Sequence, residues 1–184
     1  MHTVPVNHRR PTRTRSALTI ITLLLLALQA PGAFAQSKFD DVDSYFRVVT
    51  PLPDGSLLLH AEDGRAIGEE IEYMPEWQAY GWFTSTSRVE WDVVVERDLS
   101  YDVYLEWSVS DEQAGKPYAF RAGDEEITGT VERTGGWDRY SIANIGEMHL
   151  APGRYTMTFL PTSEFGSEDA LLDLRGVYLV PKPD

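Results

Sequence analysis

Apolar and polar residues alternate with a period of two through much of this chain, and this constrains its fold most. Residues 89–96, 101–109 and 155–160 each place an apolar side chain at every second position. A strand with one buried and one solvated face has this period, whereas an amphipathic helix repeats about every 3.6 residues. No segment carries a sustained helical stripe. Further strands are predicted at residues 57–61, 117–122, 127–132, 140–145 and 171–180.

Clusters of Gly, Pro, Asp and Ser separate these segments, as at residues 53–56, 97–100 and 122–124. Many short strands with turn signals between them predict an all-β fold, a β-sandwich of the jelly-roll kind. Residues 69–77 are the best helical candidate, but Pro75 and the composition around it favour an ordered loop. Loops carry binding residues more often than strands do, so this aromatic-rich segment is a candidate functional region.

The first 35 residues have the three parts of an export signal. Four arginines precede the apolar run of residues 17–30, and Ala33-Phe34-Ala35 supplies a small-x-small cleavage pattern. The apolar run is shorter than the roughly 20 residues of a spanning helix, so we expect no membrane insertion. The sequence therefore predicts a signal peptide at residues 1–35, a tail and lead-in strand at 36–56, and a sandwich at 57–184. The protein is expected to be secreted or periplasmic.

Charge and cysteine content narrow the partners of the predicted mature chain, residues 36–184. It keeps 12 Lys and Arg against 29 Asp and Glu, a net charge of −17. Such a surface repels nucleic acid and anionic lipid, so neither is an expected partner. The sequence contains no Cys, so packing rather than disulfides must hold the exported fold together.

Catalytic motifs are weak in this sequence. No Ser lies in a nucleophile elbow, and neither a phosphate-binding Gly-rich loop nor a His-rich metal signature occurs. A glycosidase needs two carboxylates at a set separation, and 29 acidic residues always offer some pair, so their abundance discriminates nothing. We expect no enzyme, and an enzyme that uses a carboxylate pair is the weakest of the alternatives.

Sugar binding has requirements that this chain meets better. A pyranose ring stacks its apolar face on Trp or Tyr, which offer large flat areas at little entropic cost. Trp137 follows two glycines and has Asp and Arg beside it, and Tyr80-Gly81-Trp82 continues the aromatic-rich stretch, which runs over residues 73–83. Trp137 is either a stacking platform or a lid on the core, while Tyr80 and Trp82 lean towards the core. Trp91 and Trp107 are expected inside the sandwich.

Several short strings resemble carbohydrate-binding modules of families 6 and 35. They cover residues 57–180, and their order strengthens the resemblance. The strings are Leu59-His-Ala-Glu-Asp63, Ser100-Tyr-Asp-Val-Tyr-Leu105, Thr128-Gly-Thr-Val131, Thr134-Gly-Gly-Trp137, Leu150-Ala-Pro-Gly-Arg-Tyr155 and Leu171-Leu-Asp-Leu-Arg-Gly-Val-Tyr-Leu179.

The resemblance implies a galactose-binding-like jelly roll that binds carbohydrate without catalysis. It maps the two aromatic sugar clamps of these modules onto Tyr80 or Trp82 and onto Trp137. On the last strand, Asp173 and Arg175 replace the usual sugar-binding Asn. The resemblance therefore does not imply that this chain binds the usual ligand of these modules.

The resemblance also implies a structural calcium ion, with Glu62 and Asp173 as its candidate ligands. The alternative for Glu62 is an ion pair with Arg65 or Arg175. The rival to carbohydrate binding is a structural module that docks on a protein partner and binds no sugar.

Overall fold

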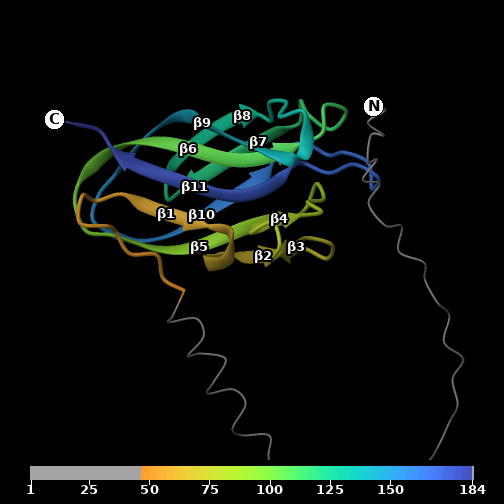
Figure 1. Cartoon of the computed structure of the whole chain (residues 1–184). Helices are drawn as coiled ribbons and strands as arrows, with labels where there is room; N and C mark the ends of the chain where they lie inside the picture. The colour runs from red at the N-terminus through yellow and green to blue at the C-terminus, as the bar shows by residue number, and fades with distance from the viewer. Residues whose placement is uncertain (1–46, 184) are drawn as a thin grey trace, which may run out of the picture. The chain divides into compact units, whose positions relative to one another are not determined.

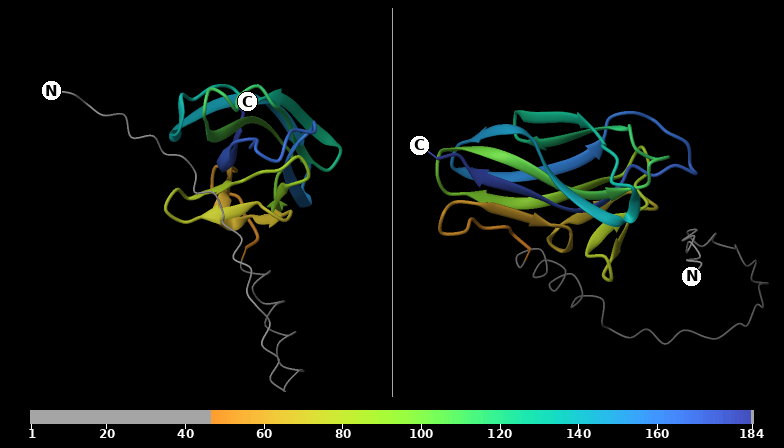
Figure 2. Two further views of the ribbon diagram at one scale, coloured as in Figure 1. Left: turned by 90° about the vertical axis from the view of Figure 1, so that its right-hand side faces the viewer. Right: turned by 45° about the horizontal axis from the view of Figure 1, so that its top comes forward.

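Two antiparallel sheets stack face to face in the residues that the computed structural model describes, 47–183 (Figure 1). The first sheet has the order β3 (Glu72–Met74), β4 (Ala79–Gly81), β11 (Asp173–Pro181), β6 (Leu99–Val109) and β9 (Gly136–Leu150), and β1 (Leu57–His60) also pairs with β11. The second has the order β2 (Arg65–Ile67), β5 (Arg88–Val95), β10 (Gly153–Pro161), β7 (Pro117–Ala122) and β8 (Glu125–Thr130). The short 3₁₀ helix η2 (Ala61–Asp63) joins β1 to β2. Figure 2 shows the two layers from other sides.

The core lies between the sheets and follows the period-two pattern. β5 alternates between partly exposed and fully buried residues along its whole length, and β6 does the same over most of its length. Trp91 and Trp107 are both buried, as predicted. The Trp91 indole N–H donates to the His60 carbonyl at 2.8 Å, so the polar atom of this buried ring is satisfied. The predicted all-β sandwich is confirmed.

The longer predicted strands correspond to β1 and to β5–β11, with shifted ends. β7 matches its predicted bounds of 117–122, whereas β9 begins at Gly136 and runs for 15 residues rather than starting at residue 140. β9 is the edge strand of the first sheet, and its mixed pattern of exposure hides the period of two.

Three short strands were missed, and one prediction about them is wrong. β2, β3 and β4 have three residues each, too few for a visible alternation. The segment 69–77, expected to be a loop, contains β3, which pairs with β4 in a hairpin. Pro75 lies just after β3, in the turn of this hairpin, where its missing N–H costs nothing.

The predicted signal peptide and most of the predicted tail lie outside the described residues. Within the predicted lead-in segment, Val49 is buried and forms a parallel bridge with Val93. Its N–H donates to the Asp92 carbonyl at 2.8 Å, and its carbonyl accepts the Val94 N–H at 2.9 Å. Residues 47–183 all belong to one compact unit. Across residues 47–183, no helix has both the length and the apolar character needed to span a bilayer.

Candidate functional site

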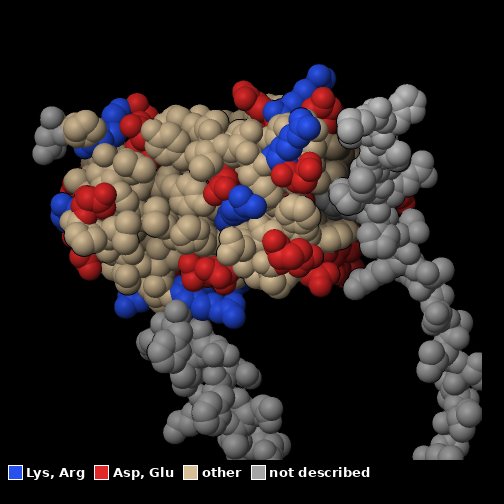
Figure 3. All heavy atoms as spheres, viewed as in Figure 1, with Lys and Arg blue, Asp and Glu red and all other residues tan. Residues whose placement is uncertain are grey.

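The outward surface of the first sheet carries a row of interacting polar and aromatic side chains. Because inward positions on β6 are apolar, the alternate residues Tyr104 and Glu106 point away from the core. We call this row the polar–aromatic face and define it by the side chains of His60, Tyr104, Glu106, Tyr140, Asp173, Arg175 and Tyr178. In Figure 1, β11 of this sheet lies in front of β10. Figure 3, from the same side, shows uncharged surface over much of this face, with a red and blue pair near its middle and further charged side chains to the right and along the edges.

Arg175 lies at the centre of the polar–aromatic face because β11 contains a bulge. The register with β6 shifts between Leu174 and Gly176, and Arg175 is the extra residue. Bulges commonly re-aim a side chain in this way. The guanidinium carbon lies 3.4 Å from the centroid of the Tyr140 ring, a cation–π contact. Nη1 donates to Glu106 Oε1 at 3.0 Å, and Nε donates to the Trp77 carbonyl at 3.2 Å. A planar guanidinium makes all three contacts at once.

Glu106 is held from a second side by Tyr178. The Tyr178 hydroxyl donates to Glu106 Oε2 at 2.5 Å. Burial raises the pKa of the Tyr178 phenol, and the hydrogen bond to Glu106 raises it further. The His60 ring meets the Tyr178 ring edge-on, with centroids 5.5 Å apart. The row His60, Tyr178, Glu106, Arg175 and Tyr140 is therefore a connected and ordered surface.

Asp173 lies at one end of this row and is only 5% exposed. Its Oδ1 occupies the space beside Gly81, 2.7 Å from where a Cβ would lie. The glycine therefore makes room for the carboxylate. On the β6 side, Asp173 is paired with Ser108, whose hydroxyl donates to the Trp137 carbonyl at 2.8 Å.

The Tyr140 hydroxyl is buried and has no well-aligned hydrogen-bond partner within residues 47–183. Burial raises the pKa of this phenol, the neighbouring Ser108 hydroxyl lowers it, and the Asp173 carboxylate raises it. Asp173, Ser108 and Tyr140 therefore form a tight polar group beside Arg175.

The aromatic residues predicted at residues 80–82 have different positions. Tyr80 is 6% exposed, points into the sandwich and donates its hydroxyl proton to the Gly64 carbonyl at 2.7 Å. A ring in this position offers no face to a ligand, so the core alternative holds for Tyr80. Trp82 is 36% exposed and has a left-handed backbone with φ +53°. Such a conformation is unusual for a bulky residue and is found most often at functional positions. Trp77, which ends the predicted aromatic-rich segment but was not proposed as a sugar clamp, is 40% exposed and lies in the hairpin turn.

Trp137 combines the two roles that the sequence left open. It is partly exposed, and it also packs against the core. Gly135 adopts φ +85°, which a residue with a side chain rarely does, and the Thr134 hydroxyl donates to the Val109 carbonyl at 2.8 Å. This turn is fixed to the end of β6, and it starts β9 so that Trp137 lies beside Ser108. The structure thus brings Trp137, Asp173 and Arg175 to one end of the first sheet.

The predicted calcium ligands do not belong to a carboxylate cluster. Glu62 is exposed on η2, whereas Asp173 is buried beside Gly81. Across residues 47–183, no three His, Cys, Asp or Glu side chains gather as a metal site would require. Calcium takes six to eight oxygen ligands, so backbone carbonyls or water would have to supply most of them. A calcium ion at Glu62 and Asp173 stays a prediction.

The alternative role predicted for Glu62 is wrong. Arg65 forms its ion pairs with Asp92 and Glu90, and Arg175 pairs with Glu106. Arg65 lies opposite Glu90 in the pairing of β2 with β5, so the sheet register sets its partners.

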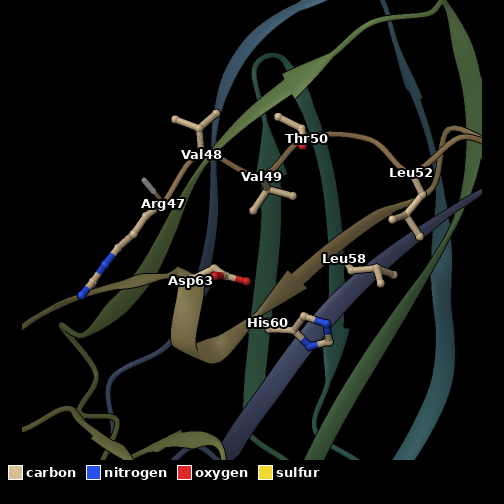
Figure 4. A pocket seen from close by; sticks show the side chains of 8 residues that line it. All are labelled: Arg47, Val48, Val49, Thr50, Leu52, Leu58, His60 and Asp63. Atoms are coloured by element: carbon tan, nitrogen blue, oxygen red, sulfur yellow. The ribbon is translucent and has the colours of Figure 1, made fainter. Parts of the chain in front are cut away.

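A hollow of about 250 Å³ lies beside β1 (Figure 4). Its apolar lining includes Val49, Leu52 and Leu58, and Arg47, His60 and Asp63 add charge or polarity. None of the tryptophans lines it. It meets the polar–aromatic face only at His60.

Sequence reasoning missed Glu106, Tyr140 and Tyr178, which hold Arg175 in place. One signal was available for Glu106. Tyr104 and Glu106 occupy the outward positions of a strand whose inward positions are apolar, and an aromatic residue among such positions is unusual on a purely solvated face. Tyr178 contacts Glu106 from 72 residues away, and only the pairing of β11 with β6 brings the two together.

Comparisons with known proteins identify the fold. No family model matches the sequence, and no curated protein matches it significantly. A family 35 carbohydrate-binding module from Clostridium thermocellum superposes with a TM-score of 0.56 at 14% identity, over 69% of this chain and 98% of that one. A family 6 module of Cellvibrio mixtus lichenase 5A, in complex with cellotriose, gives 0.54 at 15% identity, over 68% and 97%.

The same fold also occurs inside a larger protein of another kind. The mosquito-larvicidal Cry4Aa toxin from Bacillus thuringiensis gives a TM-score of 0.57 at 9% identity, over 75% of this chain and 25% of the toxin. At these identities the comparisons establish architecture and not ligand. The chain has the β-sandwich fold of carbohydrate-binding modules of the family 6 and family 35 type.

Proposed function

We propose that this protein is an exported, non-catalytic carbohydrate-binding module. The observation that carries the proposal is the arrangement at one end of the first sheet. Trp82 follows Gly81, which contacts Asp173, and Trp77 accepts a hydrogen bond from Arg175 through its carbonyl. Trp137 is tied through Ser108 to the other side of the same polar group.

This arrangement suits the chemistry of a sugar ring. Partly exposed indoles offer flat apolar area, and the partly exposed Arg175 guanidinium in the polar–aromatic face offers donors to sugar hydroxyls. Arg175 and Glu106 are already held by neighbouring side chains, so binding would cost little further ordering. The fold shared with carbohydrate-binding modules supports the same proposal.

Non-catalytic action is proposed because the carboxylates of this end have structural partners. Glu106 is held by both Arg175 and Tyr178, and Asp173 is packed beside Gly81. A general acid or nucleophile needs access to the substrate bond. Turnover of any glycoside in a broad panel, abolished by a single Asp or Glu substitution, would contradict this part of the proposal.

The test is a glycan array on residues 36–184, followed by calorimetry on the glycans that bind. Trp137→Ala and Trp82→Ala are expected to abolish or strongly weaken binding, because each removes a stacking surface. Leu52→Ala is the matched control: Leu52 is also an exposed apolar residue, but it lines the hollow beside β1. Binding should be unchanged in that variant.

Unfolding of each variant separates a lost site from a lost fold. Trp137 is partly buried, so Trp137→Ala should cost about half of the roughly 3–5 kcal/mol found for a fully buried Trp. A parent that binds no glycan, or tryptophan variants that bind like the parent, would contradict the proposal. The first outcome would favour a module that docks on a protein partner.

A further inference from the structure

A second cavity, of about 210 Å³, is lined by residues of both sheets at one edge of the sandwich. It opens between β8, at one edge of the second sheet, and β9, at one edge of the first. Its buried lining residues are Leu105, Trp107, Tyr118 and Val131, and Thr130, Glu132 and Asn144 are exposed residues around it. Aromatic and apolar walls with a few polar groups are usual in sites for small molecules.

The hydroxyl of Tyr118 distinguishes this cavity from a packing gap. Tyr118 is 4% exposed, and its ring stacks on Phe159 with centroids 5.2 Å apart. The side chain crosses its strand partner Gly129, and the hydroxyl lies 2.5 Å from where a Cβ would be at that position. Gly129 also lines the cavity, so the hydroxyl reaches it. Among residues 47–183 this hydroxyl takes part in no side-chain hydrogen bond, and it does not belong to the fully buried polar atoms without a partner, so it is accessible to bond a ligand.

The other polar groups set the chemistry of a ligand. The Trp107 indole N–H is used, since it donates to the Glu132 carbonyl at 2.9 Å, so Trp107 offers only ring surface. Asn144 Oδ1 accepts the Gly146 N–H at 3.0 Å, which leaves its NH₂ group to donate. The lining contains one carboxylate and no Lys, Arg or His, so it disfavours an anion.

Size narrows the ligand further. An apolar cavity of about 150 Å³ in another protein accommodates benzene, so this one admits a single six-membered ring with substituents. We propose that the cavity between β8 and β9 binds one neutral, polyhydroxylated six-membered ring, with Tyr118 as its central hydrogen-bonding residue. This site is separate from the polar–aromatic face, because Trp107 and Tyr118 point between the sheets.

The experiment uses ¹⁵N-labelled protein, residues 36–184, titrated with myo-inositol, methyl β-glucoside and methyl β-galactoside. At least one probe should move the amide resonances of Gly129, Thr130, Val131 and Asn144 in a saturable way. Tyr118→Phe should weaken this binding by about 2- to 10-fold, the value of one hydrogen bond. Ala143→Leu, which fills the cavity from β9, should abolish it.

Independence from the proposed glycan site is tested with Trp137→Ala and Trp82→Ala. Binding in the cavity should be unchanged in both variants, even if the array shows no glycan for the parent. Choline is the cationic counter-probe.

Any one of four results would overturn the inference. The first three are no saturable shifts with any cyclic polyol, equal binding by Tyr118→Phe, and tighter binding of choline than of the polyols. Equal binding by a folded Ala143→Leu would do the same. If Ala143→Leu does not fold, Tyr118→Phe decides, because losing an unbonded hydroxyl should leave the core intact.

Discussion

Individual residues in this fold have consequences that reach beyond their own positions. Gly129 allows Tyr118 to cross β8, and Gly81 makes room for Asp173. In both cases a polar group of a neighbouring strand occupies the space that a Cβ would take. Gly129 lies within β8 and Gly81 at the end of β4, where glycine is otherwise unfavourable. Glycine is therefore required at these positions by the close approach of a neighbouring side chain and not by a turn.

Gly129→Ala is expected to destabilise the protein by about 1–3 kcal/mol, the usual cost of overpacking. The new Cβ would lie 2.5 Å from the Tyr118 hydroxyl oxygen and 2.6 Å from the ring carbon that bears it. The ring cannot retreat easily, because it stacks on Phe159. Gly153→Ala is the matched control, since its nearest neighbour would be 3.5 Å away. Equal denaturant midpoints for the two variants would contradict this reading.

The titration of Tyr118 predicts a loss of stability in alkali. Burial raises the pKa of this phenol to about 12, and the nearby Glu132 carboxylate adds to the effect. Because the folded pKa lies above the unfolded value of about 10, stability is unaffected below pH 10 and falls between pH 10 and 12. The parent should therefore lose more stability over this range than Tyr118→Phe. Parallel curves of unfolding free energy against pH for the two proteins would show that Tyr118 ionises without cost.

At the scale of elements, the local sequence pattern predicted the long strands but not which strands pair with one another in the sheets. β5, β6 and β10 each bury one face, so their sequences carry the period of two. The strand order of the first sheet joins segments that lie far apart in the sequence, and no local signal fixes it. Glu106, Tyr140 and Arg175 meet only because β6 lies between β9 and β11. The residues of the site were therefore partly predictable, whereas their contacts were not.

The β3–β4 hairpin carries two non-glycine residues with left-handed backbones, at its turn and at its end. Gln78 has φ +52° in the turn, and Trp82 has φ +53° after β4. A left-handed conformation costs about 1–2 kcal/mol for a residue with a Cβ. Gln78 is exposed, so its side chain contributes little in return.

Gln78→Gly is therefore expected to raise the free energy of unfolding by up to about 1 kcal/mol, the strain relieved less the added entropy of the unfolded chain. Gln78→Val should lower it, because a β-branched residue suits this conformation least. Thermal melts of both variants provide the test. A lower melting temperature for Gln78→Gly than for the parent would show that the glutamine side chain stabilises the turn.

At the scale of the whole molecule, the high negative charge lowers the stability of the folded state and no disulfide adds to it, whereas burial of the apolar core raises it. The predicted mature chain carries a net charge of −17, and the sequence offers no Cys for a covalent cross-link. Repulsion among like charges destabilises a compact state, and salt screens it. Stability therefore rests on the core between the two sheets, and any bound cation would add to it.

A calcium titration tests whether one specifically bound cation stabilises the folded protein. If Glu62 and Asp173 bind it, calcium at 100 times its Kd stabilises the folded state by about 2.7 kcal/mol. For a domain of this size, that raises the melting temperature by roughly 5–10 °C. Sodium chloride and magnesium chloride at equal ionic strength control for screening, because they reduce repulsion without matching calcium's preferred coordination. Glu62→Gln should remove the calcium-specific part, whereas Glu72→Gln, also exposed but on β3, should keep it. Identical melting curves in calcium and in excess chelator, at matched ionic strength, would show that the acidic surface binds no specific calcium ion.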